Sequence, residues 1–177
     1  MKSVVDQLAM YSCYHRDNRN VITHLVGIPM IVIALLALLS RPQWLVAGFS
    51  ISPALIIVGI SVLYYLMLDL ALGVIMGVLL ALAVWLGLYI AALSTGTWLT
   101  IGIVLFIVGW TFQFVGHGYE GRKPAFVDDI MGLVIGPLFV VAECLFFLNL
   151  RKSLYEQVEL KVAELMPKLP PIAKNSK

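Results

Sequence analysis

The feature that most constrains this chain is a long stretch that carries almost no charge. Between Asn20 and Val115 the only formally charged side chains are Arg41 and Asp69. A chain of 177 residues cannot hide that much apolar sequence inside a water-soluble fold, because its interior is too small. Over the whole chain 12% of the residues are charged, against about 25% in soluble domains. The sequence therefore predicts a polytopic membrane protein, an all-α bundle of transmembrane helices.

The apolar sequence divides into four to five runs that are candidates for membrane-spanning helices, each of which needs about 20 apolar residues. The longest run has room for two spans, and Asp69 is the natural break between them. In the last run the Gly136-Pro137 pair could break the helix and produce a re-entrant hairpin, so a full fifth span and a hairpin both remain open. The runs are Leu25–Ser40, Trp44–Leu93, Trp98–Gly116 and Ile130–Leu150.

After Arg151 the composition changes to a segment rich in lysine and glutamate. Apolar residues recur there at spacings of three or four until Pro167, which is typical of an amphipathic helix lying at the lipid headgroups. We therefore expect one transmembrane domain over residues 1–150 and, over residues 151–177, an amphipathic surface helix with a flexible basic tail. The apolar positions are Leu154, Val158, Val162 and Leu165.

The number of membrane crossings predicts that the unusual polar residues lie on one face of the membrane. The three runs before His117 contain four candidate spans, because the longest run holds two. If all four spans cross, the chain returns to its starting side, and His117 shares a face with His15 and His24. Asp69, two crossings in, lies on that face too. The segments on this side hold five lysine and arginine residues and the opposite loops hold only Arg41, so the positive-inside rule places this side in the cytoplasm. A full fifth span would carry the basic tail to the outside, whereas a hairpin would keep it inside, and the side of the tail stays open. We expect an integral membrane protein of the bacterial inner (cytoplasmic) membrane, with its site facing the cytoplasm.

All three histidines of the chain stand in two dense polar motifs. His15 and His24 each follow a polar residue by four positions, and His117 precedes Glu120 by three, so each pair shares a helix face. Imidazole and carboxylate groups are ligands for Fe(II), Zn(II) or Mn(II), and a set without thiolate suits iron that activates O₂. A single histidine at a membrane interface is more often an anchor or a hydrogen-bond donor, and that interpretation remains open.

Two further acids and a group of basic residues are candidates for supporting roles. An acid at the bilayer centre costs about 2.5–3.5 kcal/mol, so such residues are usually functional or paired. Asp69 either ends a helix or acts as an extra metal ligand or a hydrogen-bonding support of a histidine. Glu143 is either a protonated acid bonded to a neighbour or a residue that closes the site, and it is also a candidate for the support of a histidine. Basic side chains either bind a substrate carboxylate or serve only the membrane topology. They are Arg16, Arg19, Arg122 and Lys123.

Besides a non-catalytic membrane scaffold, which leaves the clustered histidines unexplained, residue types alone allow two classes of function. One is a membrane-embedded, metal-dependent oxygenase. The other is a small metal-ion or proton transporter or channel, with the histidines and Asp69 lining the path. A transporter should place ionisable groups along the membrane depth, whereas these gather at one face, which favours the enzyme. A nucleic-acid partner is not expected, since the net charge is +2 and no basic run is interleaved with aromatic residues.

The two histidine motifs resemble those of a known family. They read Tyr11-x₃-His15-x₄-Asn20-x₃-His24-x₂-Gly27-x-Pro29 and Gln113-Phe-x-Gly116-His117-x₂-Glu120, followed by Lys123-Pro124-Ala125 and by Gly136-Pro137 with Glu143. This pattern resembles the integral membrane family of 2-hydroxy fatty acid dioxygenases, typified by the yeast endoplasmic-reticulum enzyme. The resemblance covers almost the whole chain except the tail.

The resemblance implies Fe(II)-dependent alpha-oxidation, in which a 2-hydroxy fatty acid and O₂ give a fatty aldehyde or acid one carbon shorter. Carried over by position, His15, His24 and His117 would bind the iron, and Glu120 would be a fourth ligand or a base. Tyr11 and Asn20 belong to the same motifs and, with Glu120, are expected to be catalytic residues. The implied partners are the fatty acid, O₂ and the lipid bilayer, and residues 1–150 would form the catalytic domain.

Overall fold

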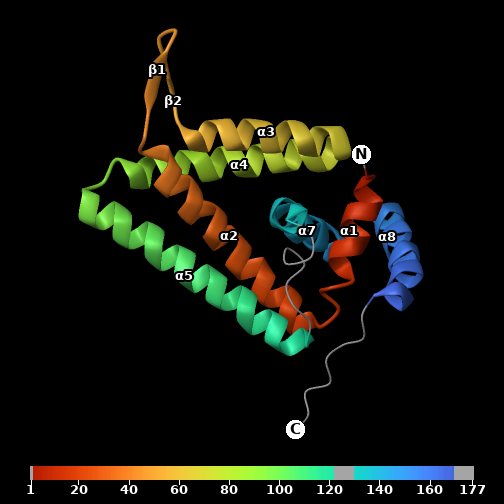
Figure 1. Cartoon of the computed structure of the whole chain (residues 1–177). Helices are drawn as coiled ribbons and strands as arrows, with labels where there is room; N and C mark the ends of the chain where they lie inside the picture. Colours follow the sequence, from red (N-terminus) through yellow and green to blue (C-terminus); the bar gives the residue numbers. More distant parts are fainter. Residues whose placement is uncertain (1, 122–129, 170–177) are drawn as a thin grey trace. The chain divides into compact units, whose positions relative to one another are not determined.

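The computed structural model describes residues 2–121 and 130–169, and these are almost entirely helical (Figure 1). The all-α prediction is confirmed, with one short hairpin as the exception. The helices are α1 (Val4–Ser12), α2 (Asn18–Ser40), α3 (Pro53–Leu68), α4 (Leu70–Ala91), α5 (Thr95–Glu120), α7 (Met131–Phe147), α8 (Lys152–Leu165) and the short 3₁₀ helix η1 (Met166–Lys168). The hairpin consists of β1 (Trp44–Val46) and β2 (Phe49–Ile51).

The chain forms two compact units. One comprises residues 1–26 and 112–177, and the other comprises Gly27–Thr111. All three histidines belong to the first unit, which therefore contains the candidate site.

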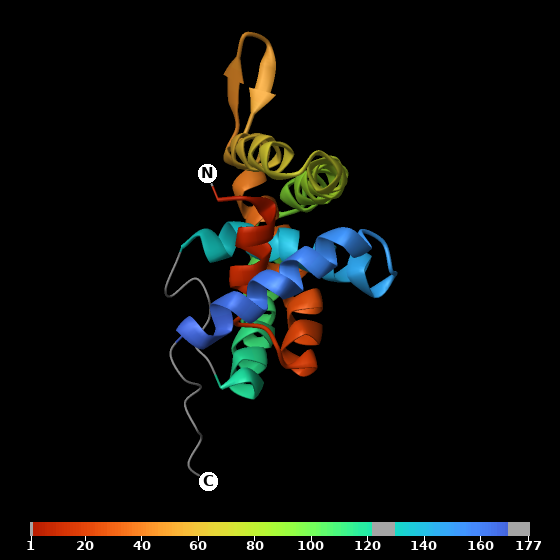
Figure 2. The same ribbon diagram turned by 90° about the vertical axis from the view of Figure 1, so that its right-hand side faces the viewer.

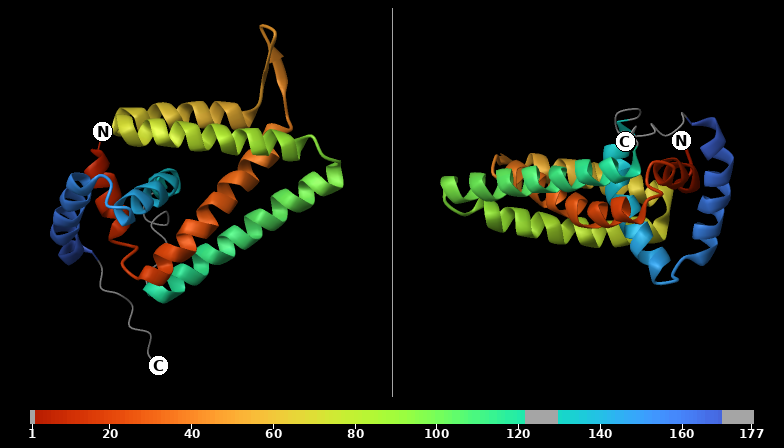
Figure 3. Two further views of the ribbon diagram at one scale, coloured as in Figure 1. Left: turned by 180° about the vertical axis from the view of Figure 1, so that it is seen from behind. Right: turned by 90° about the horizontal axis from the view of Figure 1, so that it is seen from below.

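In the second unit α3 and α4 pack side by side along their length (Figure 3). Asp69 separates them, as the sequence predicts: its side chain accepts a hydrogen bond from the Leu72 N–H at 2.9 Å and so caps the start of α4. Gly73 lies directly against the Leu66 backbone, where a Cβ would overlap it. The two helices can approach this closely because that position has no side chain.

The expected span beginning at Trp44 is wrong in its first eight residues, which form the β1–β2 hairpin. Its turn, Ala47-Gly48, has positive φ at both residues, 49° and 84°. As a result α3 has only 16 residues, fewer than the about 20 that cross a bilayer. By length and composition three described helices are long enough to cross, α2, α4 and α5. The four crossings expected before His117 thus reduce to three long helices and one short one.

In the first unit α1 packs against both α7 and α8 (Figure 2). Gly136-Pro137 does not break the last apolar run, because α7 continues through Pro137. The chain turns instead after Phe147, where Asn149 and Arg151 have positive φ. The helix axis bends by 117° between α7 and α8.

The predicted amphipathic helix of the tail is present as α8, and its apolar stripe is buried rather than exposed. Leu154, Val158 and Val162 are 6%, 1% and 4% exposed, in the unit where α8 packs on α1. The apolar residues that predicted a helix at the membrane surface are therefore buried within the protein, in the unit where α8 packs on α1. The apolar helices as a whole make this chain an integral membrane protein.

Candidate metal centre

The three histidines come from three different segments and meet in the first unit. His15 lies in the turn between α1 and α2, His24 lies in the second turn of α2, and His117 lies in the last turn of α5. All three are buried, and one ring nitrogen of each lies within 4.8 Å of the others. The ring centroids are 4.4 to 5.0 Å apart, and every pair meets edge to face. The convergence expected from the motifs is therefore found.

The hydrogen bonds of His15 and His24 define which nitrogens are free. His15 Nδ1 donates to the Tyr11 carbonyl at 2.7 Å, and His24 Nδ1 donates to the Asn20 carbonyl at 2.9 Å. A carbonyl can only accept, so each Nδ1 carries the proton and each neutral ring keeps a lone pair on Nε2. The two Nε2 atoms are 3.0 Å apart. Two facing lone pairs repel each other unless a cation lies between them, so this arrangement fits a metal ion.

His117 supplies a third nitrogen donor. Its side chain is 7% exposed, and its Nδ1 atom is buried without a hydrogen-bond partner among the described residues. Three imidazoles with no thiolate among them are a donor set that suits iron as well as zinc or manganese.

Burial keeps His15 in the form that binds metals. Desolvation and the neighbouring His24 and His117 lower the pKa of His15 well below its ordinary value of 6.5. The imidazole is therefore neutral at pH 7, and a neutral ring is required for coordination.

Aromatic side chains fix the plane of the His15 ring. The Tyr11 ring stacks parallel to it at a centroid distance of 4.2 Å, and Phe139 from α7 contacts both rings at 4.7 and 5.3 Å. Burial raises the pKa of the Tyr11 phenol, so it stays protonated. Tyr11, which the motif predicts beside the reacting groups, therefore supports His15 with both its carbonyl and its ring.

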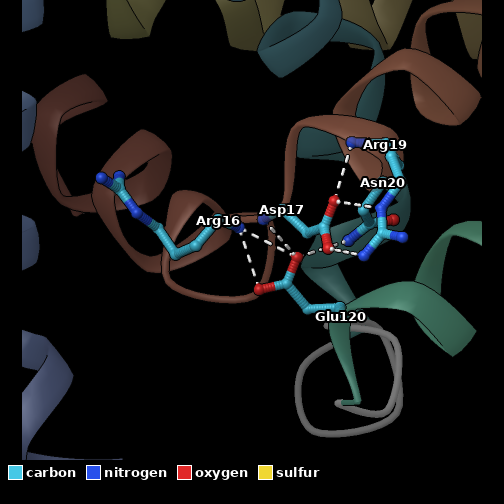
Figure 4. Close-up of polar contacts among 5 residues, drawn as sticks. All are labelled: Arg16, Asp17, Arg19, Asn20 and Glu120. Carbon is cyan, nitrogen blue, oxygen red and sulfur yellow. Dashed lines mark hydrogen bonds and ion pairs between the residues drawn. The ribbon is translucent and has the colours of Figure 1, made fainter.

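Glu120 holds the turn that carries His15 (Figure 4). Its carboxylate accepts hydrogen bonds from the backbone N–H groups of Arg16 at 3.0 Å and Asp17 at 2.8 Å, and from Asn20 Nδ2 at 3.1 Å. Among the described residues the group of metal-binding geometry consists of the three histidines alone. The geometry thus favours an orienting role for Glu120, and its role as a ligand or base stays a prediction.

Asn20 connects this turn to both helices that carry the other histidines. It is fully buried, donates to the Tyr14 carbonyl at 3.2 Å as well as to Glu120, and offers its own carbonyl to His24. Gly116 of α5 faces it, since a Cβ at Gly116 would overlap Asn20 Oδ1 and Thr23 Oγ1. The absence of a side chain at Gly116 allows α2 and α5 to bring their histidines together.

The basic residues near the group already have anionic partners. Arg16 forms a two-pronged ion pair with Glu159 of α8 at 2.8 and 3.1 Å, its guanidinium pointing away from Glu120 (Figure 4). Arg19 pairs with Asp17 at 2.7 Å and lies 4.6 Å from the centroid of the Tyr119 ring. The other two candidates for binding a substrate carboxylate, Arg122 and Lys123, lie outside the described residues.

The two isolated acids lie in different units. Glu143 is half-buried on α7, within electrostatic range of Arg16 and Glu159. Asp69 belongs to the second unit, where it caps α4. Support of a histidine by either residue stays a prediction.

Two contributors to the site escaped the sequence analysis. Phe139 belongs to an apolar run, where one more aromatic residue carries no signal. Glu159 is one of several acids in the charged tail, and only its ion pair with Arg16 distinguishes it.

Comparison with known proteins agrees with the motifs. The model of the family described as 2-hydroxy-palmitic acid dioxygenase Mpo1-like matches residues 1–148. The chain is 34% identical over 167 residues to the 2-hydroxy-palmitic acid dioxygenase MPO1 of Saccharomyces cerevisiae, which covers 90% of this chain and 91% of that protein. No solved structure matches this chain. The chain therefore belongs to the 2-hydroxy-palmitic acid dioxygenase Mpo1-like family.

Proposed function

We propose that this protein is an Fe(II)-dependent dioxygenase that converts 2-hydroxy fatty acids and O₂ to products one carbon shorter. The observation that carries the proposal is the buried group of His15, His24 and His117, in which two unprotonated Nε2 atoms face each other at 3.0 Å. Membership of the family supports the substrate class, since the yeast relative is named for 2-hydroxy-palmitic acid. If the product is the shorter fatty acid, the reaction is balanced by release of the carboxyl carbon as CO₂ together with water.

The three histidines would hold the iron, which would supply the reducing electrons that activate O₂. Hydrogen bonds on the Nδ1 side orient two of the rings: the Tyr11 carbonyl accepts from His15 Nδ1–H, and the Asn20 carbonyl accepts from His24 Nδ1–H. The Tyr11 ring also stacks on the His15 ring. Such outer hydrogen bonds set the tautomer of each ligand. Glu120 fixes the turn through backbone N–H groups, so His15 is positioned before any substrate binds.

The membrane setting suits a fatty acid substrate. The acyl chain can stay among apolar helices while the carboxylate and 2-hydroxyl groups reach the polar residues around the histidines. Arg16 would bind the substrate carboxylate only if that group displaced Glu159 from its two-pronged ion pair. Arg19, Arg122 and Lys123 are the other candidates for this role. We propose that this face of the membrane is cytoplasmic, because Arg16, Arg19, Arg122 and Lys123 adjoin the histidine motifs, whereas Arg41 is the only arginine or lysine between Asn20 and Val115.

Product analysis tests this function. Purified protein reconstituted with Fe(II) is given 2-hydroxypalmitate labelled at the carboxyl carbon, under O₂. We expect the label to leave the lipid and the remaining product to be one carbon shorter, with both changes abolished by an iron chelator. Retention of the label in the lipid, or turnover that survives chelation, would contradict the proposal.

A further inference from the structure

Each of the three histidines follows another polar residue by four positions. Tyr11 precedes His15, Asn20 precedes His24, and Gln113 precedes His117. In the first two pairs the histidine Nδ1 donates to a group of the earlier residue, its carbonyl. His117 differs, because its Nδ1 is buried without a hydrogen-bond partner among the described residues.

Gln113, four positions before His117 on α5, also has an unpaired polar group. Its side chain is 5% exposed, and its Nε2 atom is also buried without a partner among the described residues. The residues beside it on α5, Phe112 and Phe114, are apolar. An unpaired buried polar group costs about 1–3 kcal/mol. Two such groups, one helical turn apart on one face of α5, therefore need an explanation.

Helix geometry places Gln113 and His117 on neighbouring turns of one face of α5. Side chains in an α-helix lean toward its N-terminus, so the His117 ring leans over the turn that contains Gln113. The two groups do not bond to each other in the structure, since both are without a partner among the described residues. A rotation of the Gln113 side chain that directs its amide oxygen to the ring lets the amide accept from Nδ1–H, and His117 then keeps Nε2 for a metal.

We propose that Gln113 is the positioning residue of His117, with its side-chain amide oxygen accepting the Nδ1 proton. All three histidines then present Nε2 to the metal. The Nδ1–H group of each donates a hydrogen bond to the residue four positions earlier. The inference rests on the metal site of the proposed function and adds a residue to which no role was assigned. Loss of an outer partner of this kind weakens metal binding about 10–100-fold.

The first test uses the wild-type protein. It is labelled with ¹⁵N-histidine, loaded with Zn(II), which is diamagnetic, and studied by NMR. We expect three metal-bound Nε2 signals and three protonated Nδ1 signals. A ring that binds zinc through Nδ1 would overturn the inference, because the atom assigned to Gln113 would then be the ligand.

The second test compares three variants by zinc affinity. Gln113→Leu keeps the size but removes the acceptor, Gln113→Glu keeps an acceptor but removes the donor, and Thr111→Val is the control at an exposed position of α5. We expect Leu to weaken zinc binding about 10–100-fold, whereas Glu and the control retain it. Unchanged affinity in the Leu variant, or equal loss in the Leu and Glu variants, would overturn the inference.

Thermal unfolding and size-exclusion chromatography check that each variant is folded. If a substitution prevents folding, the NMR measurement on the wild type decides alone. A wild-type protein that binds neither Zn(II) nor Fe(II) would contradict the proposed function itself, and so is distinguishable from a failure confined to Gln113.

Discussion

At the scale of single residues, the site depends on a close approach between α2 and α5 at Gly116. A methyl group there would overlap Asn20 Oδ1 and Thr23 Oγ1, and Asn20 is held in place by Glu120 and by the Tyr14 carbonyl. The clash therefore cannot be relieved by moving one free side chain. It has to displace the hydrogen bonds that position His15 and His24.

Gly116→Ala should lower both stability and metal affinity. Overpacking of this kind costs about 1–3 kcal/mol of unfolding free energy. Gly118→Ala is the matched control, because a Cβ there meets nothing within 4 Å. Chemical denaturation and Zn(II) titration should show loss in the first variant and none in the second. Equal behaviour of the two would show that the helices do not need the close approach.

Glu120→Gln should destabilise the metal-free protein as well as weaken metal binding. The substitution replaces one acceptor oxygen by a donor that faces backbone N–H groups, and hydrogen bonds to charged groups contribute about 1.5–3 kcal/mol. Unfolding of the metal-free variant is the measurement, with the exposed Glu156→Gln as the control. If Glu120 is instead only a ligand, the metal-free protein will keep wild-type stability.

The pairing of residues on helix faces could be predicted from their spacing, because residues three or four positions apart lie on the same face of an α-helix. The function of Glu120 could not. Its partners are backbone N–H groups of a non-helical turn, and every residue except proline carries such a donor.

At the scale of the elements, α8 contributes to the unit that contains the histidines. Its Leu154 is 6% exposed, while Leu160 on the same helix is 74% exposed. Through Glu159 the helix also holds Arg16, the residue that follows His15.

Leu154→Ala should cost about 2–5 kcal/mol of unfolding free energy, the usual range for a buried leucine. Leu160→Ala on the same helix should have little effect. Denaturation in detergent compares the two. Should both substitutions behave alike, α8 would not pack in the protein and would lie on the membrane surface, as its amphipathic pattern alone suggests.

The β1–β2 hairpin was not predictable from hydropathy. Trp44, Leu45, Val46 and Phe49 are all apolar, and hydropathy does not distinguish a strand from a helix. The local signs were Ala47-Gly48 at its turn, Ser50 within the run, and Ser52-Pro53, which caps and begins α3. By contrast, the break at Asp69 was predictable, since a carboxylate that caps a helix start leaves a charge in an apolar run.

At the scale of the whole molecule, a common site for the three histidines requires both motifs to lie on one face of the membrane. Single cysteines at Asn18 and Asp128, in a protein lacking Cys13 and Cys144, should both resist an impermeant thiol reagent in intact cells. A cysteine at Ser50, beyond the first long helix, should react. Labelling of Asn18 or Asp128 alone would separate His15 and His24 from His117, so no common site could exist.

The most direct test of the central claim is the iron content and O₂ consumption of the wild type and of His15→Ala, His24→Ala and His117→Ala. Each protein is purified without O₂, reconstituted with Fe(II) and mixed with 2-hydroxypalmitate. The wild type should bind iron and consume O₂ only with substrate. Each variant should lose both properties yet keep its helical content, because packing and internal hydrogen bonds hold the helices. Wild-type iron and turnover in the three variants would contradict the account and leave the histidines as interfacial anchors.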